Sequence, residues 1–305
     1  MKKVSIITVN YNQVEVTLEL LRSLEVQDYT NIEVIVVDNG SKDDGFDKIH
    51  IEFPKVITIK SEKNLGFAGG NNLGIQASTG DYLFFLNNDT VVPHGTIASL
   101  VNVLNREKET GVVCPVINYY DQPLVTQFAG YTPINTFTGR NHAIGYMQRV
   151  PVANLLVDTP FAHGAAMMMK REVVEAAGEM PENYFLYYEE LDWGAKITKA
   201  GFKIKVDRSV RILHKESVST GKASPLKTYF QTRNRVLFMR RNVQGIRRFA
   251  FLLFFTFLAF PKALVSFLVK REMEHFHSYW NGAVWNLFNG IDSLKLGYKY
   301  DQLRG

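Results

Sequence analysis

Two groups of carboxylates, about a hundred residues apart, are the side chains of this sequence best suited to catalysis. Asp89 ends the segment Asn87-Asn88-Asp89, which follows the apolar run Tyr82–Leu86, and the second group is Glu189-Glu190-Leu191-Asp192. Open α/β sheets bind ligands at the carboxyl ends of their strands. One carboxylate there can hold a metal while a second transfers a proton. We therefore expect Asp89 to bind a divalent cation and the acidic cluster to supply a base.

The acidic cluster has a simpler interpretation, because acidic residues stabilise the first turn of a helix. Its aromatic surroundings argue for more. The cluster lies among Tyr184, Phe185, Tyr187, Tyr188 and Trp193. Partial burial and a neighbouring like charge both raise the pKa of a carboxyl group, and a raised pKa is what a general base needs.

His214 follows a short strand-like segment, 210–213. A histidine in that position is more often structural than a ligand. Together with Asp89, however, it would form a mixed oxygen and nitrogen site, which suits Mn²⁺ at least as well as Mg²⁺. For Asn87-Asn88-Asp89 alone, a turn at the end of a strand is the simpler interpretation.

The segment Asn64–Asn72 places three glycines at the start of a predicted helix. Such a start lets a ligand approach the backbone and suits phosphate or sugar. Its spacing is not G-x-G-x-x-G and no Lys-Ser or Lys-Thr follows, which excludes dinucleotide and P-loop motifs. Thr8–Asn12 and Asp38 follow two other strands and offer an aromatic ring and a carboxylate for reading a nucleobase. Alone, each is also an ordinary turn.

Alternating strand and helix patterns predict the elements that position these residues. Strands are expected at 4–9, 32–37, 56–59 and 82–86, with helices at 14–26 and 66–78 between them, which indicates a parallel sheet with right-handed crossovers. Further strands are expected at 161–169, 203–206 and 210–213, with helices at 171–177 and 191–200. Residues 119–160 show no clear period. We expect a catalytic domain over residues 1–224 and a helical extension over residues 225–305.

Composition is that of a globular protein, with 46% apolar and 21% charged residues in a chain of 305. The single cysteine, Cys114, rules out an intrachain disulfide and fits a reducing compartment. No secretory signal is visible, because the first apolar stretch ends at Asn10. We expect a cytoplasmic location.

The net charge of +5 comes largely from one region, since Ser217–Arg271 holds eleven Lys or Arg and no Asp or Glu. Within it, Phe249–Val269 is almost wholly apolar apart from Pro261-Lys262. Apolar residues with basic flanks suit an anionic membrane surface better than nucleic acid. We expect a monotopic helix or helical hairpin on the inner membrane face. A packing or homodimer helix ranks second, and a true span, which would bury Lys262, ranks last.

In their order, these motifs resemble family-2 glycosyltransferases, in particular the branch that holds bacterial rhamnosyltransferases. The matching segments are Thr8-Val9-Asn10-Tyr11-Asn12, Val36-Val37-Asp38-Asn39-Gly40-Ser41, Asn64-Leu65-Gly66-Phe67-Ala68-Gly69-Gly70-Asn71-Asn72, Leu86-Asn87-Asn88-Asp89, His163-Gly164-Ala165-Ala166-Met167, Tyr187-Tyr188-Glu189-Glu190-Leu191-Asp192-Trp193, His214 and Arg233-Asn234.

The resemblance implies a GT-A nucleotide-diphospho-sugar transferase fold, a mostly parallel α/β sheet with flanking helices, and an inverting, metal-dependent reaction. It implies that Glu190 is the base, that Asp192 orients the acceptor or the base, and that Asp89 and His214 bind Mg²⁺ or Mn²⁺. Asp38 would contact the nucleobase. The other implied contacts to the nucleotide sugar are Thr8, Asn10, Tyr11, Asn64, Gly66, Gly69, Asn71, Asn87 and Asn88, and those of the donor or acceptor pocket are His163, Gly164, Glu189 and Trp193.

We therefore expect the transfer of one sugar, rhamnose or another hexose, from a UDP- or dTDP-sugar to a cell-surface glycan or lipid-linked acceptor. The Gln-x-x-Arg-Trp motif of processive members is absent from the sequence. Asn87 stands where many members have an Asp. This departure keeps open an alternative, a non-catalytic nucleotide-sugar-binding or scaffold protein of the same fold.

Overall fold

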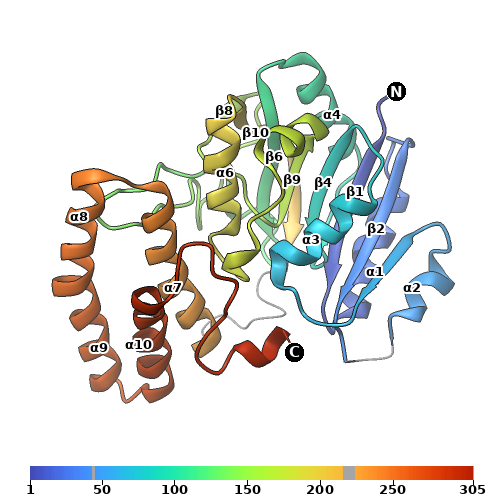
Figure 1. Cartoon of the computed structure of the whole chain (residues 1–305). Coiled ribbons are helices and arrows are strands. Elements are labelled where there is room, and N and C mark those ends of the chain that lie inside the picture. Colours follow the sequence, from blue (N-terminus) through green and yellow to red (C-terminus); the bar gives the residue numbers. More distant parts are fainter. Residues whose placement is uncertain (43–44, 216–223, 305) are drawn as a thin grey trace.

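A ten-stranded mixed sheet with helices on both faces forms the centre of the computed structural model, which describes residues 1–42, 45–215 and 224–304 (Figure 1). The strand order is β3-β2-β1-β4-β9-β6-β10-β5, with β7 paired to β6 and β8 to β10. The strands are β1 (Val4–Asn10), β2 (Ile32–Asn39), β3 (Ile57–Ser61), β4 (Tyr82–Asn87), β5 (Thr90–Val91), β6 (Thr110–Tyr119), β7 (Thr126–Phe128), β8 (Leu156–Asp158), β9 (Ala166–Lys170) and β10 (Lys203–His214).

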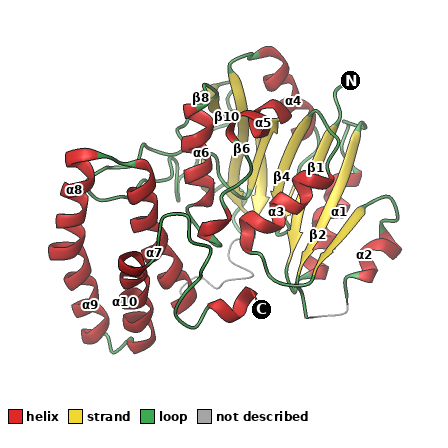
Figure 2. Cartoon of the chain, in the orientation of Figure 1, coloured by secondary structure: helices red, strands yellow, loops and turns green. Residues whose placement is uncertain are grey.

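The helices flank the sheet and continue beyond it (Figure 2). They are α1 (Val14–Glu25), α2 (Asp47–Glu52), α3 (Gly66–Ala77), α4 (Thr96–Arg106), α5 (Arg171–Ala177), α6 (Glu189–Lys199), α7 (Pro225–Asn242), α8 (Gly245–Phe254), α9 (Phe260–Val269) and α10 (Met273–Phe288). A π-helical turn, Phe255–Ala259, joins α8 to α9.

The first four long strands are parallel, as predicted, and their register aligns the polar residues at their carboxyl ends. Asn10 of β1 lies opposite Asp38 of β2, and Val9 lies opposite Asn87 of β4. The motifs that follow these strands are therefore brought to one edge of the sheet, where α/β sheets bind ligands.

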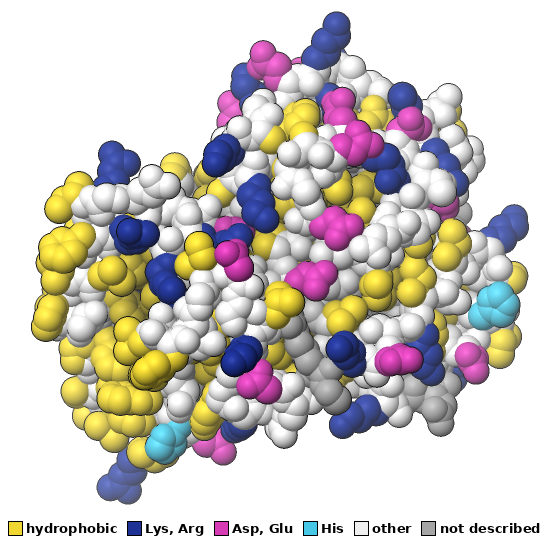
Figure 3. Space-filling model, viewed as in Figure 1, with side chains coloured by type: hydrophobic (Ala, Val, Ile, Leu, Met, Phe, Trp, Pro, Cys, Tyr) yellow, Lys and Arg dark blue, Asp and Glu magenta, His cyan; other side chains and the backbone are white. Residues whose placement is uncertain are grey.

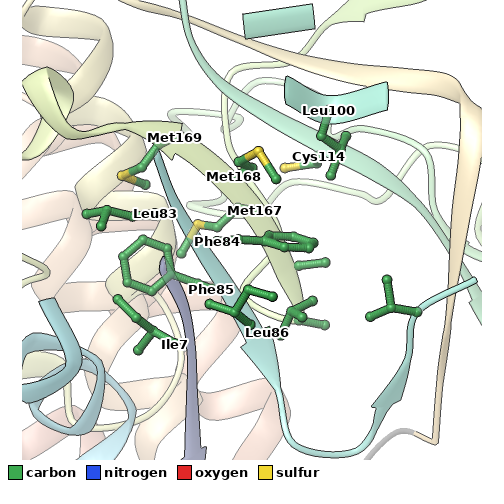
Figure 4. Packing of buried hydrophobic residues seen from close by; sticks show 14 of the residues in the cluster. Ile7, Leu83, Phe84, Phe85, Leu86, Leu100, Cys114, Met167, Met168 and Met169 are labelled. Carbon is green, nitrogen blue, oxygen red and sulfur yellow. The ribbon is translucent and has the colours of Figure 1, made fainter. Parts of the chain in front are cut away.

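The core explains why β4 is a run of five apolar residues. Tyr82–Leu86 are all buried, because helices cover both faces of the sheet. Antiparallel β9 lies beside β4 and pairs Met167 with Phe85 (Figure 4). The Trp193 ring of α6 packs edge-on against the Phe85 ring, with the ring centroids 5.5 Å apart. The core thus fixes α6, which carries the acidic cluster, against the strand that ends near Asp89.

Two expectations about strands were wrong. The predicted strand 161–169 begins only at Ala166, because Ala166 N–H donates to the carbonyl oxygen of His163 and closes a turn. The two short strands predicted at 203–206 and 210–213 form one strand, β10, with an irregularity after Asp207. The Asp207 carboxylate accepts from the main chain and hydroxyl of Ser209, which stabilises this irregularity.

Helices α7 to α10 stand beside the sheet, with α10 packed along α7 (Figure 1). The apolar segment does not break at Pro261, because the π turn precedes it and Pro261 lies in the first turn of α9. The chain is therefore helical from Gly245 to Val269. The start of the basic block, residues 217–223 with Lys222, lies outside the described residues, and the boundary between residues 224 and 225 stays a prediction.

Candidate active site

A cavity of about 870 Å³ opens at the carboxyl ends of β1, β2 and β4 and extends to the C-terminal helices. Asp89 and Glu190, which come from segments far apart in the chain, both line it. The other predicted site residues that line it are Tyr11, Asn64, Gly66, Asn87, Asn88, His163, Gly164, Glu189 and His214. The sheet edge and the acidic helix therefore share one site.

The His214 ring connects the cavity to the strand β7. Its Nδ1 lies 2.7 Å from Gln127 Oε1, and because a carboxamide oxygen only accepts, Nδ1 carries a proton. In the neutral imidazole, Nε2 then has a lone pair, which faces Asp89 Oδ1 at 3.1 Å and accepts a long hydrogen bond from Asn87 Nδ2 at 3.4 Å. That oxygen is buried and has no hydrogen-bond partner among the described residues.

This pair fits a divalent cation. Two lone pairs that face each other across this short gap repel, and a shared cation would turn both into ligands. The described residues contain no group of three or more His, Cys, Asp or Glu side chains placed to hold a metal ion. A cation at Asp89 and His214 would therefore need further oxygen ligands from a bound substrate or water.

Glu189 and Glu190 begin α6, and the pKa of each carboxyl group is raised. Burial raises the pKa of Glu190 to about 7. Burial, followed by the charge of Glu190, raises the pKa of Glu189 well above its ordinary value. Glu189 is 4% exposed, whereas Glu190 is partly exposed in the cavity. Burial thus favours the protonated form of Glu189, and Glu190 is able to take up a proton near neutral pH.

The loop before α6 is held in a strained conformation. Phe185, Tyr187 and Tyr188 have positive φ angles of 68°, 67° and 75°, and each costs about 1 kcal/mol or more in a residue other than glycine. The Asn234 side chain donates to the carbonyl oxygens of Tyr184, Leu186 and Tyr187. Fully buried Arg233 donates to those of Asn183 and Tyr184. Helix α7 therefore fixes the backbone that presents Glu190.

His163 lines the middle of the cavity as a neutral ring. Burial, with a smaller contribution from His214, lowers the pKa of His163 to about 3. Its Nδ1 accepts from Ala165 N–H at 3.1 Å, so Nε2 carries the proton. The Tyr131 ring stacks on His163 at a centroid distance of 6.0 Å. The pair offers a neutral hydrogen-bond donor and a flat surface to a ligand.

Near the sheet edge, Asn39 and Asn64 shape the start of α3. Asn39 donates to Asn64 Oδ1 and to the Gly66 carbonyl oxygen. Gly66 has a φ of 75°, and a Cβ there would lie 2.4 Å from the Phe185 carbonyl oxygen. The amides of Gly66 and Phe67 already donate to Asn64 Oδ1 and Phe185 O. Gly66 thus lets the start of α3 pack against the loop before α6. Because the amides of Gly66 and Phe67 are already hydrogen-bonded, they are not free to bind phosphate as expected.

Several predicted nucleotide contacts lie below the cavity surface. Thr8, Asn10 and Asp38 are fully buried, and Asn10 Nδ2 donates to Asp38 Oδ1. Asp38 Oδ2 has no hydrogen-bond partner among the described residues. Asn71 donates back to the Phe67 carbonyl oxygen within α3. A Cβ on Gly69 would lie 2.6 Å from Leu65 Cβ, so Gly69 relieves packing within the helix.

Asp192 and Trp193 point away from the cavity. Asp192 is 1% exposed, accepts from Asn242 Nδ2 at 2.5 Å and lies 3.4 Å from the Arg241 guanidinium. Trp193 packs in the core and donates from Nε1 to the Gly178 carbonyl oxygen. Neither side chain lines the cavity, so the structure does not show the expected contact of Asp192 with an acceptor or of Trp193 with the pocket, and the orientation of the base by Asp192 stays a prediction. Asp192 anchors α6 to the end of α7.

The cavity also includes residues that sequence reasoning missed. They are Asn39, Gln127, Tyr131, Arg140, Tyr188, Lys227 and Arg235, together with the aromatic residues Phe267 and Tyr279. Three of them come from the region 119–160, where the sequence shows no periodicity. The signal in the sequence for Asn39 was its place directly after Asp38 at the end of a strand.

Comparison with known proteins gives the family and the fold. Residues 5–178 match the family model described as glycosyl transferase family 2. A low-salt glycan biosynthesis hexosyltransferase of Haloferax volcanii is 28% identical over 244 residues, which cover 76% of this chain and 74% of that protein. An N-acetylglucosaminyl-diphospho-decaprenol L-rhamnosyltransferase of Mycobacterium tuberculosis is 23% identical over 237 residues, which cover 71% of this chain and 77% of that protein.

Solved structures are similar over most of the chain. GalNAc-T7 with UDP, GalNAc and Mn²⁺ superimposes with a TM-score of 0.61 at 14% identity and covers 86% of this chain and 57% of that one. A Pyrobaculum calidifontis mannosyltransferase with GDP-Man and Mn²⁺ gives a TM-score of 0.59 at 17% identity and covers 94% of this chain and 87% of that one. The predicted GT-A fold is confirmed.

Proposed function

The chain belongs to glycosyltransferase family 2, and on this premise we propose that it transfers a single sugar from a nucleotide diphospho-sugar to a lipid-linked glycan acceptor, with inversion at the anomeric carbon. The observation that carries the proposal is the shared cavity: Glu190, with a pKa of about 7, lines it together with the facing lone pairs of Asp89 and His214.

The donor would bind at the sheet edge. Asp89 and His214 would hold a Mg²⁺ or Mn²⁺ ion, which when bound stabilises the negative charge of the leaving diphosphate. Asn64 and Tyr11 line the same end of the cavity and would contact the nucleotide. We propose that Asp38 contacts a base N–H of UDP or dTDP. Its Oδ2 has no hydrogen-bond partner among the described residues, but the side chain is fully buried, so this contact requires it to become accessible.

The acceptor would enter from the side of α6. Glu190 would take the proton of the attacking hydroxyl, a step worth about 10²- to 10⁴-fold in rate. The neutral His163 would donate from Nε2 to a sugar oxygen. Burial favours the protonated form of Glu189, which disfavours a second negative charge beside the base. The Mycobacterium relative is named for a diphospho-decaprenol acceptor, and we propose the same class of acceptor here.

A membrane surface suits such an acceptor. Gly245–Val269 is the one helix of the described residues that is long and apolar enough to cross a membrane, and almost none of its apolar segment is buried. Phe251 and Phe255 pack against the protein, while Phe257 and Leu258 are more than 60% exposed. Figure 3 shows the apolar side chains gathered over α8 and α9. Because one face packs on the protein, we propose that this helix lies in the membrane surface instead of spanning the membrane.

Replacement of Glu190 by Gln tests the proposal. The variant should keep Mn²⁺-dependent thermal stabilisation by UDP or dTDP, because Gln preserves the shape of the side chain. Its rate of sugar transfer, measured with a panel of nucleotide sugars and a lipid-diphosphate acceptor, should fall by at least about 100-fold. Unchanged transfer would contradict the catalytic proposal. Donor stabilisation with no transfer by the wild-type protein would instead support the non-catalytic alternative.

A further inference from the structure

Two arginines that have no acidic partner among the described residues line the end of the cavity that is next to the C-terminal helices. Arg235 of α7 is 5% exposed and Arg140 is exposed, and both line the cavity. Neither forms an ion pair with a carboxylate among the described residues. Burial lowers the pKa of Arg235, and the charge of Arg140 lowers it further.

The protein itself only partly compensates the Arg235 charge. Its Nε donates to the Thr138 carbonyl oxygen at 2.8 Å, and its guanidinium lies 5.5 Å from the centre of the Phe255 ring. A buried charge without a counter-ion is costly, and a second cation nearby adds to that cost. Two cations that line one cavity without a carboxylate partner among the described residues suit the binding of an anion.

The position of the pair separates it from the proposed donor site. Arg235 donates to the carbonyl oxygen of Thr138, and Tyr188, which immediately precedes the acidic cluster, donates from its hydroxyl to that of Gly139, the residue before Arg140. Asp89 and His214 belong to the sheet-edge end of the same cavity. Glu190 lies two residues after Tyr188 and lines the same cavity as both arginines.

Beside the arginines, the lining of the cavity includes the aromatic rings of Phe267 and Tyr279. Phe255, whose ring Arg235 contacts, stacks on Tyr279 at a centroid distance of 6.5 Å. Tyr279 also contacts Phe267 of α9, and both line the cavity. This aromatic wall leads from the arginines to the exposed apolar surface of α8 and α9.

We propose that Arg140 and Arg235 bind the diphosphate of a polyprenyl-diphosphate-linked acceptor. Guanidinium groups bind phosphate oxygens in pairs, and both arginines keep donors for that purpose. The acceptor sugar would then lie toward Glu190, and the first isoprene units would follow the wall of Phe255, Tyr279 and Phe267 toward the membrane. This inference rests on the proposed function, since it assigns the acceptor's headgroup to a place in the same site.

Binding of farnesyl diphosphate, a soluble lipid diphosphate, tests the inference by calorimetry on the full chain. We expect Arg140→Gln and Arg235→Gln each to weaken its binding at least tenfold, and Arg235→Lys to weaken it less. The matched control is Arg149→Gln, because Arg149 is exposed in the same region but does not line the cavity. Inorganic diphosphate should bind at least tenfold more weakly than farnesyl diphosphate. Because Arg140 is exposed, its variant keeps the test informative if the Arg235 variant fails to fold.

The binding of UDP and dTDP with Mn²⁺ in the same variants separates this inference from the proposed function. If neither arginine substitution changes the affinity for farnesyl diphosphate while nucleotide binding stays normal, the arginine site is overturned and the proposed function is not. Equal affinity for inorganic diphosphate would overturn the assignment to a lipid. Arginine-dependent binding of farnesyl diphosphate without any nucleotide binding would support this site and contradict the proposed function.

Discussion

The Asn234 side chain donates from Nδ2 to the main-chain oxygen of Tyr187 at a distance of 2.8 Å. The same group also contacts the carbonyl oxygens of Tyr184 and Leu186, so one buried amide holds the left-handed loop that precedes Glu190. Removal of the amide would leave carbonyl oxygens unsatisfied and allow the loop to relax. The motif position of Asn234 in the sequence thus has a structural meaning, which is to position the base.

We expect Asn234→Ala to lower kcat at least tenfold while leaving the affinity for UDP or dTDP with Mn²⁺ within threefold. The stability loss should be about 1–3 kcal/mol. Steady-state kinetics and thermal unfolding measure the two effects. Asn281→Ala is the matched control, because the Asn281 amide donates to His277 O on its own helix. A kcat equal to that of the wild type would show that the loop does not depend on Asn234.

The pH dependence of transfer should report Glu190. A base must be ionised to act, and burial raises the pKa of Glu190 to about 7. The rate should therefore rise about tenfold per pH unit below pH 7 and level off above it. A profile of kcat/KM between pH 5 and 9 measures this, with protein integrity checked at each pH. A rate that is flat from pH 5 to 7 would exclude Glu190 as the base.

The stability of the protein should respond to Glu189 with the opposite dependence on pH. Its folded pKa is raised by burial, so its contribution to stability is fully present below about pH 4.5 and is lost as pH rises through the folded pKa. Glu189→Gln removes this penalty because Gln stays neutral. We expect the Tm of the variant, relative to the wild type, to increase by about 2 °C or more between pH 5 and 9. A Tm difference that does not change with pH would contradict the raised pKa.

Much of this site could be predicted from the sequence, and the rest depends on tertiary packing that no local pattern reveals. The apolar run Tyr82–Leu86 predicts a buried strand, and a buried strand delivers Asp89 to the sheet edge. The acidic cluster could have been resolved further. Residues 190 and 192 are about 200° apart on a helix, so if Glu190 faces the cavity, Asp192 must face away.

Arg140, Tyr131 and Gln127 could not be found in this way. They lie on β7 and the loops after it, where the chain shows neither a helical nor a strand period. The hairpin Asn135–Arg140 is closed by a hydrogen bond from Asn135 N–H to Arg140 O. The distant side chains of Tyr188 and Arg235 donate to its carbonyl oxygens. Arg235 lies in a predicted helical region, but only the packing of α7 against Phe255 shows that it is buried.

The orientation of His214 makes metal affinity depend on Gln127, which holds the Nδ1 proton and aims Nε2 at Asp89. Loss of a group that orients a metal ligand commonly costs about 10- to 100-fold in affinity. We expect Gln127→Leu to weaken Mn²⁺ binding in the presence of UDP or dTDP by that amount, measured by calorimetry, and His214→Ala to weaken it further. His142→Ala, at an exposed histidine, is the control. Unchanged Mn²⁺ affinity in the His214 variant would rule this site out.

The exposed surface of α8 and α9 should direct the protein to anionic membranes. Phe257 and Leu258 are 69% and 61% exposed, whereas Phe251 and Phe255 in the same helical segment are buried. We expect the double substitution of Phe257 and Leu258 by Ser to reduce flotation with phosphatidylglycerol vesicles at least fivefold, without loss of stability.

Ile51→Ser is the matched control, because Ile51 is 80% exposed on α2, which is remote from these helices (Figure 1). Basic residues flank the apolar segment, so binding to zwitterionic vesicles should be weaker than to anionic ones. If the double variant still floats but changes from dimer to monomer in light scattering, the surface joins two copies of the chain and the membrane proposal fails. Apolar area supplies the attraction in either case, so the response to lipid charge and the oligomeric state together separate a bilayer from a second protein.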